Sequence, residues 1–480
     1  MVEKATLISY LEKQLATAPE RLLANIVDQN NKDLLDRFIF IRIEKYINDF
    51  IDGKNVENRW ITIPGFRGTG KTTLLSQLYH TLLEKGIPRD RLLYLSLDEV
   101  TKLLQSNLYE MLEIYETLRG STLETTKDKL FLFLDEAHYD EKWDATVKTV
   151  FDRSKNIFVL VTGSSALALQ TSADSARRMH IEKLFPLTFI EYIKLKKHIF
   201  PETKLKNNLE HIIFESSSAD EVYKKLKTFQ SSVTKYWSQI EPFEFEKYLT
   251  TGTLPFSIGL TKDFDIYQRV INILEKVIYD DIATLDNYDK NTLDKIWNLL
   301  IILSDTDRIS LESLAEKIGV EKPTVLKILN TLSKAELIFP VKAYGSVSKQ
   351  TTKSPKYPFT APAIKAALLW KLGKLSPTPP VYGKLLQDVV ALYLHKFSSI
   401  NSHFSVNYDS EKGCADFVVG DSRNNSQIAI EVSYGTNKDT SQVRTTMQKL
   451  SAKYGLVVSQ HELAIEENVV FIPHKFFFLL

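Results

Sequence analysis

The sequence has few of the features that would place the protein outside a reducing cell interior or in a membrane. Its 480 residues include one cysteine, Cys414, which excludes an internal disulfide and a zinc site built from several cysteines. Residues 1–6 lack a basic segment followed by an apolar stretch, so we expect no signal peptide. The longest apolar runs, such as residues 299–303, are far too short to span a bilayer. We therefore expect a soluble cytoplasmic protein with no membrane contact.

An excess of charge of either sign is also missing. Lys and Arg number 61, Asp and Glu number 60, and the formal net charge is +1. A chain-wide positive field that would attract nucleic acid is therefore excluded, and any such contact has to come from a local patch. The length is too great for a single core, so we expect several domains.

Residues 65–72 are the most informative segment, because they fit the phosphate-binding pattern G-x-x-x-x-G-K-[ST] at every fixed position. An apolar run before them predicts a strand, and leucines at helical spacing over 73–83 predict a helix. Lys71 would reach the β- and γ-phosphates of ATP, and the Thr72 hydroxyl would ligate Mg²⁺. The residues of the predicted nucleotide site are Gly65, Arg67, Gly68, Thr69, Gly70, Lys71, Thr72 and Thr73.

Two carboxylates after another apolar run complete this predicted site. Residues 130–134 are apolar at consecutive positions, as in a central parallel strand that is buried on both faces. We expect Asp135 to hold Mg²⁺ together with Thr72, and Glu136 to act as the base that polarises the attacking water. The combination with the phosphate loop predicts ATP hydrolysis.

Polar residues end a further predicted strand at 156–163. Thr162 and Ser164 are candidate sensors of the γ-phosphate, and a helix cap is the alternative interpretation. Arg178 follows in a polar loop, from which an arginine can stabilise transition-state charge in a neighbouring subunit of a homo-oligomer. On spacing alone, a solvated surface pair with Arg177 explains it equally well.

Strands that alternate with helices predict a doubly wound α/β sheet in the first part of the chain. Later, a capped helix, a glycine, a second helix with proline in its first turn and an apolar strand at 337–341 predict a winged helix. Three polar residues of that second helix, Lys322, Thr324 and Lys327, are candidate contacts to double-stranded DNA. The predicted regions are an N-terminal helical segment at 1–40, a P-loop ATPase core at 41–195, a helical lid at 196–288, the winged helix at 289–350 and a small α/β domain at 351–480.

Several motifs occur in a fixed order along the chain. They are Asp135-Glu136-Ala137-His138 with Trp143, Thr-Gly-Ser-Ser at 162–165, Arg178 ahead of Pro-Leu-Thr-Phe-Ile-Glu-Tyr at 186–192, and Tyr-Leu-Thr-Thr-Gly-Thr-Leu-Pro at 248–255. In this order they resemble prokaryotic AAA+ ATPases that carry a C-terminal restriction-endonuclease-like domain, although Arg177 stands where that family has glycine. The resemblance runs from about residue 40 to the end. It implies an AAA+ core that uses ATP and Mg²⁺ and a finger role for Arg178.

The resemblance also implies a nuclease-like fold at the C-terminus, in which acidic residues bind Mg²⁺ and a lysine orients water. Asp416 and Glu431 match two of the acidic positions. Ser433 replaces the lysine, Gln387 replaces a helix glutamate, and Cys414 stands where the family often adds an acid. We therefore expect a degenerate nuclease that serves as a structural or DNA-docking module.

Three functions remain open from the sequence. The first is an ATPase coupled to DNA binding or remodelling, and the second is a nucleotide-operated switch that binds a protein partner in stress or defence signalling. The third is an ATP-regulated nuclease that uses Asp416 and Glu431. Turnover stimulated by DNA favours the first, slow turnover indifferent to DNA favours the second, and Mg²⁺-dependent nicking favours the third.

Overall fold

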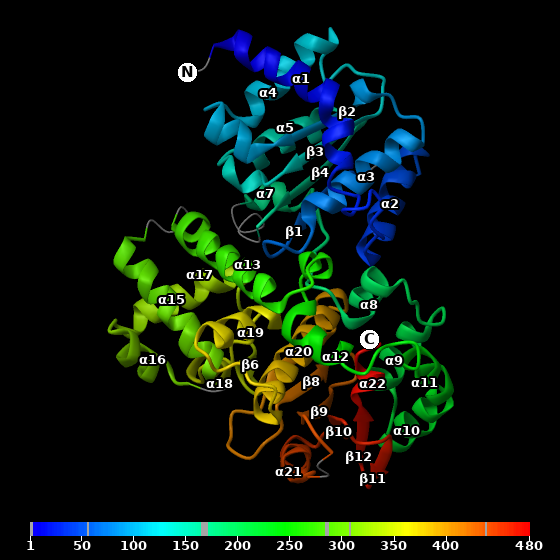
Figure 1. Ribbon diagram of the computed structural model, residues 1–480, viewed down its shortest axis with the longest axis vertical. Helices are drawn as coiled ribbons and strands as arrows, with labels where there is room; N and C mark the ends of the chain where they lie inside the picture. Colours follow the sequence, from blue (N-terminus) through cyan, green and yellow to red (C-terminus); the bar gives the residue numbers. More distant parts are fainter. Residues whose placement is uncertain (1–2, 55–56, 165–170, 284–287, 307–308, 437–438) are drawn as a thin grey trace. The chain divides into compact units, whose positions relative to one another are not determined.

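The chain folds into two compact α/β units. Unit 1 comprises residues 1–185 with the short stretch 334–336, and unit 2 comprises residues 186–333 and 337–480. In Figure 1 the helices and strands of unit 1 run from blue to cyan-green, and those of unit 2 from green to red. The structure is a computed structural model that describes residues 3–54, 57–164, 171–283, 288–306, 309–436 and 439–480.

Unit 1 is built on a five-stranded sheet with the order β2-β3-β4-β1-β5. Every neighbouring pair is parallel, so all the strands end at the same edge of the sheet. This confirms the predicted α/β class with a parallel P-loop type of sheet. The strands are β1 (Trp60–Pro64), β2 (Leu92–Ser96), β3 (Leu130–Asp135), β4 (Ile157–Gly163) and β5 (His180–Ile181).

Helices cover both faces of this sheet (Figure 1). Side chains alternate along each strand, so that Trp60 and Leu132 join one apolar core while Ile61 and Phe131 join the other. Consecutive apolar residues are therefore needed in each central strand, as the sequence shows. The first core takes in α4 (Leu108–Arg119) and α5 (Trp143–Arg153), and the second takes in α2 (Phe38–Ile51) and α3 (Lys71–Glu84). The helix α1 (Lys4–Leu23) contributes to both, with Leu7 and Leu11 in the first core and Ala18 and Leu22 in the second.

Unit 2 contains a mixed seven-stranded sheet with the order β11-β12-β10-β9-β8-β7-β6. The strands β9, β10 and β12 are parallel, whereas β7, β8 and β9 form an antiparallel meander. The strands are β6 (Lys342–Ala343), β7 (Phe404–Tyr408), β8 (Phe417–Asp421), β9 (Ser426–Val432), β10 (Tyr454–Ser459), β11 (Ala464–Glu466) and β12 (Val469–Pro473). The strand β6 follows the predicted winged-helix pair but joins this sheet, by parallel pairing with β7.

Helices make up most of the rest of unit 2. None of those among the described residues combines the length and apolar character needed to cross a bilayer. They include α8 (Phe189–Lys197), α9 (Leu205–Glu215), α10 (Ala219–Thr228), α11 (Gln230–Trp237), α12 (Glu244–Lys247), α13 (Asp263–Lys276), α15 (Lys290–Asp305), α16 (Leu311–Ile318), α17 (Lys322–Lys334), α18 (Val347–Thr352), α19 (Pro362–Lys371), α20 (Pro379–Ile400), α21 (Ser441–Leu450) and α22 (His474–Phe477).

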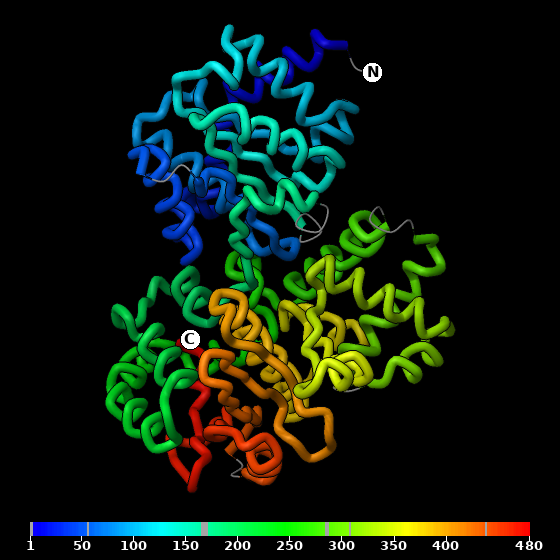
Figure 2. The backbone as a smooth tube through the Cα atoms, turned by 180° about the vertical axis from the view of Figure 1, so that it is seen from behind, coloured from blue at the N-terminus to red at the C-terminus, as the bar shows by residue number. Residues whose placement is uncertain are grey.

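The C-terminal strands lie beside helices from much earlier in the chain. Figure 2 shows the red C-terminal segment against the green helices, as Figure 1 does from the opposite side. The Tyr454 hydroxyl of β10 donates to the Ile213 carbonyl at 2.9 Å, and the Trp237 indole N–H donates to the Lys475 carbonyl at 2.8 Å. Unit 2 is thus closed by contacts between its two ends.

The sequence motifs at 186–192 and 248–255 pack against each other at the start of unit 2. The Leu187 N–H donates to the Thr253 carbonyl at 2.8 Å, and the Tyr248 hydroxyl donates to the Leu187 carbonyl at 2.9 Å. The two motifs are therefore parts of one structural joint, even though some 60 residues separate them in the chain.

The centre of this joint is a close approach between Tyr192 and Gly252. The Tyr192 hydroxyl donates to Glu244 at 2.9 Å, and Lys196 donates to the same carboxylate at 2.9 Å, so the ring is held in place. A Cβ atom on Gly252 would lie 2.8 Å from a Tyr192 ring atom, which is closer than packed atoms allow. Glycine at this position is thus a packing requirement.

Substitution of Gly252 by alanine should destabilise unit 2 by about 1–3 kcal/mol, because the added methyl group overpacks against a fixed ring. Denaturant unfolding of the full chain, followed by tryptophan fluorescence, measures the change. The matched control is Gly259→Ala, since a Cβ there has no atom within 4 Å. Equal unfolding midpoints for the two variants would show that the Tyr192–Gly252 contact is unimportant.

A candidate nucleotide site at the edge of the parallel sheet

The predicted phosphate loop connects β1 to α3 at the edge where the parallel strands end. Gly68 and Gly70 have φ angles of +89° and +92°, which residues with a side chain rarely adopt. The helix α3 begins directly after Gly70, at Lys71, so its positive N-terminal end lies at the loop. This arrangement is the one in which backbone N–H groups and a helix dipole bind an anion.

Lys71 is a buried cation inside this loop. The residue is 5% exposed, and its ammonium group donates to the carbonyls of Gly65 at 3.0 Å and Phe66 at 3.4 Å. Within the part of the chain that the structure describes, no carboxylate forms an ion pair with it. A buried charge without a counter-charge is costly, and the phosphates of a nucleotide would provide that counter-charge. The loop residues therefore fit an anionic ligand.

The loop is held from within and from the N-terminal part of the chain. The Thr69 hydroxyl donates to the Phe66 carbonyl at 2.8 Å, and Arg37 donates to the Thr69 carbonyl at 3.1 Å. Arg67, within the loop, and Thr73, after Thr72, are half-buried. No sequence motif points to Arg37, because it is a lone arginine just before a helix.

Asp135 collects hydrogen bonds from three other segments at the end of β3. Its Oδ2 atom accepts from the Thr72 hydroxyl at 2.7 Å and from the Tyr94 hydroxyl at 3.0 Å. Its Oδ1 atom accepts from the Thr162 hydroxyl and from the Glu136 N–H, the latter at 3.2 Å. The two residues predicted to hold Mg²⁺, Thr72 and Asp135, are thus in direct contact, and Tyr94 is an additional member that the sequence analysis did not identify.

Burial of Asp135, with the nearby Glu136 charge, raises the pKa of the Asp135 carboxyl above its ordinary value. A divalent cation beside Asp135 would offset both effects. No group of three or more His, Cys, Asp or Glu side chains able to hold a metal occurs among the described residues. A Mg²⁺ ion that keeps several waters and binds the nucleotide's phosphates needs no such group, since one hydroxyl and one carboxylate suffice.

Glu136 and the predicted sensors lie together beyond Asp135. The Glu136 N–H lies 3.3 Å from the Thr162 hydroxyl, and its carboxylate lies 3.4 Å from Nδ1 of His138. The Ser164 N–H donates to the same His138 nitrogen at 3.3 Å. The Ser164 hydroxyl is buried and has no hydrogen-bond partner among the described residues. Ser165, which ends the motif, lies outside those residues.

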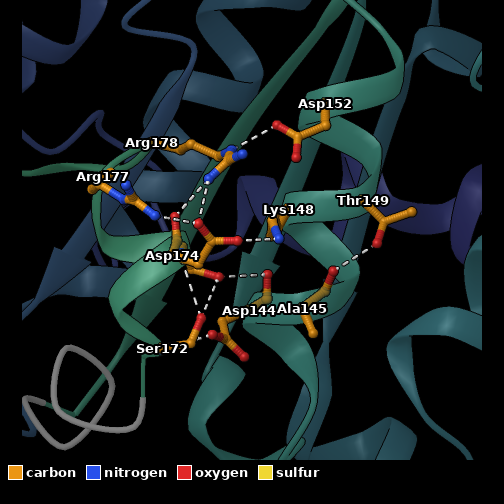
Figure 3. Close-up of polar contacts among 10 residues, drawn as sticks. Asp144, Ala145, Lys148, Thr149, Asp152, Ser172, Asp174, Arg177 and Arg178 are labelled. Carbon is orange, nitrogen blue, oxygen red and sulfur yellow. Dashed lines mark hydrogen bonds and ion pairs between the residues drawn. The ribbon is translucent and has the colours of Figure 1, made fainter.

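Arg178 is held by partners in its own chain (Figure 3). Its Nε atom donates to Asp152 of α5 at 2.6 Å, and its Nη1 atom donates to the carbonyl of Asp174 at 2.7 Å. Asp174 lies in the short helix α7 (Ala173–Ala176) and also pairs with Lys148 and Arg177, which hold its pKa at about 2. A finger role in a neighbouring subunit would require Arg178 to leave these two acidic residues.

Two of the three residues predicted to contact DNA also have partners within the protein. Lys322 forms an ion pair with Glu312, and the Lys327 ammonium lies 4.7 Å from the centroid of the Tyr288 ring. Thr324 is half-buried on the same helix, α17. Lys322 and Lys327 nevertheless remain exposed, so DNA contact by this helix stays a prediction.

The nuclease-like carboxylates lie at one end of two neighbouring strands, with Asp416 just before β8 and Glu431 near the end of β9. Asp416 accepts hydrogen bonds from Gln387 at 3.2 Å and from the Val432 N–H at 3.2 Å, and it pairs with Lys356 at 3.4 Å. An ammonium group therefore neutralises Asp416 where the family resemblance implies Mg²⁺. Lys356 carries no sequence signal, because it lies 60 residues before its partner.

Residues 57–193 match the family model of the AAA domain, AAA_14, and residues 242–374 match a domain of unknown function, DUF8612. The first match spans the sheet, the phosphate loop and Asp135. Unit 1 thus contains an AAA-type domain.

The whole chain also has relatives. It is 36% identical to the uncharacterized protein MJ1637 of Methanocaldococcus jannaschii over 457 residues, which are 95% of this chain and 91% of that protein. The chain belongs to the family of this archaeal protein. A second protein of the same organism, the uncharacterized MJ1544, is 23% identical over 68% of this chain and 66% of its own length.

Solved structures with some similarity include Aeropyrum pernix ORC1 in complex with DNA, with a TM-score of 0.30, 12% identity and coverage of 70% of this chain and 93% of that one. AMPPCP-bound DnaA from Aquifex aeolicus has a TM-score of 0.28, 16% identity and coverage of 65% and 92%. These scores are low, so the strand order, the loop and the family match remain the basis for describing unit 1.

The burial of Lys71 predicts that Lys71→Met makes the ligand-free protein more stable by about 1 kcal/mol, because a buried unpaired charge is removed. Thermal and denaturant unfolding without nucleotide measure the change. The matched control is Lys129→Met, because among the described residues Lys129 also donates to carbonyls alone, those of Phe50 at 2.9 Å and Ile51 at 2.5 Å. These carbonyls end α2, where a cation is favourable, so this control should be destabilised. A loss of stability in Lys71→Met would contradict the assignment.

Proposed function

We propose that this protein is an ATPase that binds ATP with Mg²⁺ in the loop at 65–73 and couples its hydrolysis to work on double-stranded DNA. The observation that carries the proposal is the buried Lys71 ammonium at the start of α3, next to the contact between Thr72 and Asp135. A cation that lacks a counter-charge, beside a hydroxyl and a carboxylate suited to Mg²⁺, matches a nucleoside triphosphate in charge and in chemistry.

Each residue then has a distinct role. Lys71 exchanges its two carbonyl partners for phosphate oxygens, and Thr72 and Asp135 hold the metal. When bound, Mg²⁺ neutralises charge that develops on the phosphates. Glu136 orients the attacking water and accepts its proton. Thr162 contacts Glu136 and Ser164 contacts His138, and in the proposal both sense the presence of the terminal phosphate.

Support for the DNA half of the proposal comes from unit 2. Its predicted winged helix presents Lys322 and Lys327 at the surface, and phosphate contacts by lysine are the general means of holding a duplex. The nuclease-like region is better suited to bind DNA than to cleave it, because Lys356 already neutralises Asp416. Cleavage by Asp416 and Glu431 is therefore not part of the proposal.

A nucleotide-operated switch remains the second candidate, favoured by the ion pairs of Arg178. Because Asp152 and Asp174 hold this arginine within its own chain, the isolated protein should turn over ATP slowly. Assembly into a homo-oligomer through Arg178 would break these pairs and raise the rate. This oligomer stays a prediction.

The proposal predicts ATP turnover that duplex DNA stimulates and that falls by roughly 100-fold or more in Glu136→Gln, because the water loses its base. Phosphate release from the purified full chain, with and without DNA, measures it. Glu136→Gln should still bind ATP with Mg²⁺, whereas Asp135→Asn should lose the effect of Mg²⁺ on binding because it removes a metal ligand. The two variants thus separate binding from chemistry at adjacent positions.

Turnover that survives in both variants would overturn the ATPase assignment. Turnover that is slow, lost in Glu136→Gln and indifferent to DNA would leave the ATPase standing and replace the DNA-coupled function with the switch.

A further inference from the structure

One segment of unit 2 has a charge composition unlike that of the rest of the chain. Residues 337–387 contain eight lysines and no aspartate or glutamate. The whole chain has almost equal numbers of positive and negative residues, so this segment is a local concentration of positive charge. The sequence analysis expected nucleic acid contact, if any, to depend on a patch of this kind.

Five of the eight lysines are paired with acidic residues from elsewhere in unit 2. Lys356 and Lys365 pair with Asp416 and Asp388, and the remaining three pair on the surface with Glu275 or Asp305. The acidic partners offset the positive charge of these five lysines.

The other three lysines, Lys342, Lys349 and Lys353, form what we call the lysine strip. They follow one another along β6, α18 and the residue after α18. Lys342 and Lys353 are exposed and Lys349 is half-buried, and none of the three has an ion-pair partner in the part of the chain that the structure describes.

The backbone brings two of these lysines toward each other. Gly345 lies between β6 and α18 with a φ angle of +135°. A Cβ atom on it would approach Cδ of Lys349 to 2.9 Å, so the aliphatic part of Lys349 lies over this glycine. The Lys349 side chain thus extends back toward the end of the strip that carries Lys342.

The other end of the strip reaches a cavity of about 260 Å³. Lys353 lines this cavity together with Lys356, Tyr357 and Tyr408. The volume is several times the ~30 Å³ share of one water molecule, so a hydrated phosphate group fits. Because Lys356 is paired with Asp416, Lys353 supplies unpaired positive charge at this wall.

We propose that the lysine strip and the cavity at its end bind the sugar-phosphate backbone of double-stranded DNA. The residues between the lysines include two serines, two threonines and a glutamine, at 346, 348 and 350–352, whose hydroxyl and amide groups also bind phosphate oxygens. The contact reads no bases, so it holds a duplex of any sequence while α17 is free to contact the grooves. This inference rests on the DNA half of the proposed function and gives that half a location.

A membrane surface fits the segment less well. A helix that lies on a bilayer needs an apolar face to insert, and α18 has six residues, of which Val347 is the one large exposed apolar side chain. Charge alone would attract anionic lipid, so a vesicle test belongs in the experiment.

The experiment compares two triple variants of the full chain that lose the same charge. The test variant is Lys342→Gln, Lys349→Gln and Lys353→Gln. The matched control is Lys224→Gln, Lys247→Gln and Lys262→Gln, three exposed lysines of unit 2 that also have no ion-pair partner among the described residues. Affinity for a duplex of about 30 base pairs is measured over a series of salt concentrations, after thermal unfolding has shown that both variants are folded.

The test variant should bind the duplex about tenfold or more weakly, and the slope of log affinity against log salt should become shallower by about 2–3, because each lost phosphate contact removes about 0.9. The control should keep the wild-type slope. Equal slopes in the two variants would overturn the lysine strip but leave the proposed function intact if wild-type turnover still responds to DNA. If the wild-type protein does not bind the duplex, both the lysine strip and the DNA-coupled function are wrong. The same holds if the wild-type protein binds phosphatidylserine vesicles but not the duplex, and the test variant no longer binds the vesicles.

Discussion

The carboxylate of Asp135 is the interaction on which the nucleotide site depends. It accepts hydrogen bonds from Thr72 of the phosphate-binding segment, Tyr94 of β2 and Thr162 of β4. These donors come from segments that are far apart in sequence and meet only because the parallel strands end at one edge. One buried acceptor therefore fixes where the loop, the metal position and the predicted sensor lie relative to one another. The same burial makes its negative charge costly until a cation arrives.

Lys71, the residue before Thr72, carries a buried charge of the opposite sign. The ammonium group is buried against two carbonyl oxygens, which stabilise its positive charge less than the negative charge of a phosphate would. The empty site therefore contains two buried charges, Asp135 and Lys71, that lack the opposite charge a ligand would supply. The site is less stable empty than filled. The difference in free energy between the empty and the filled site favours nucleotide binding. The same residues thus lower the stability of the empty protein and promote its function.

The sequence was sufficient where chemistry and periodicity act locally. Consecutive apolar residues at 130–134 predicted a strand buried on both faces, and β3 occupies these residues. The glycine and lysine spacing predicted the loop between β1 and α3. What the sequence could not predict depends on long-range contacts. Arg37 braces the loop from 32 residues away, and Tyr94 reaches Asp135 only because β2 lies beside β3.

Unit 2 shows the same limit. Its nuclease-like carboxylate Asp416 was found from spacing, but the cation that neutralises it, Lys356, comes from an earlier, irregular segment with no motif. Residues 337–341, which follow the predicted helix pair, form antiparallel bridges to residues 356–360, at Ile338–Phe359 and Val341–Lys356. The next two residues form β6, an edge strand of the C-terminal sheet, and its pairing with β7 is a long-range contact that the sequence could not predict. Similarly, Arg178 stands in the expected motif, but its ion pairs with Asp152 and Asp174 depend on how α5 and α7 pack.

The most direct test of the account is a calorimetric titration of the purified full chain with the slowly hydrolysed analogue ATPγS, in the presence and absence of Mg²⁺. The account predicts close to one nucleotide per chain, with micromolar or tighter affinity that Mg²⁺ strengthens, since the ligand supplies the counter-charge that Lys71 lacks and the metal supplies the one that Asp135 lacks. Absence of binding with Mg²⁺ present, at protein concentrations where the chain is folded, would contradict it.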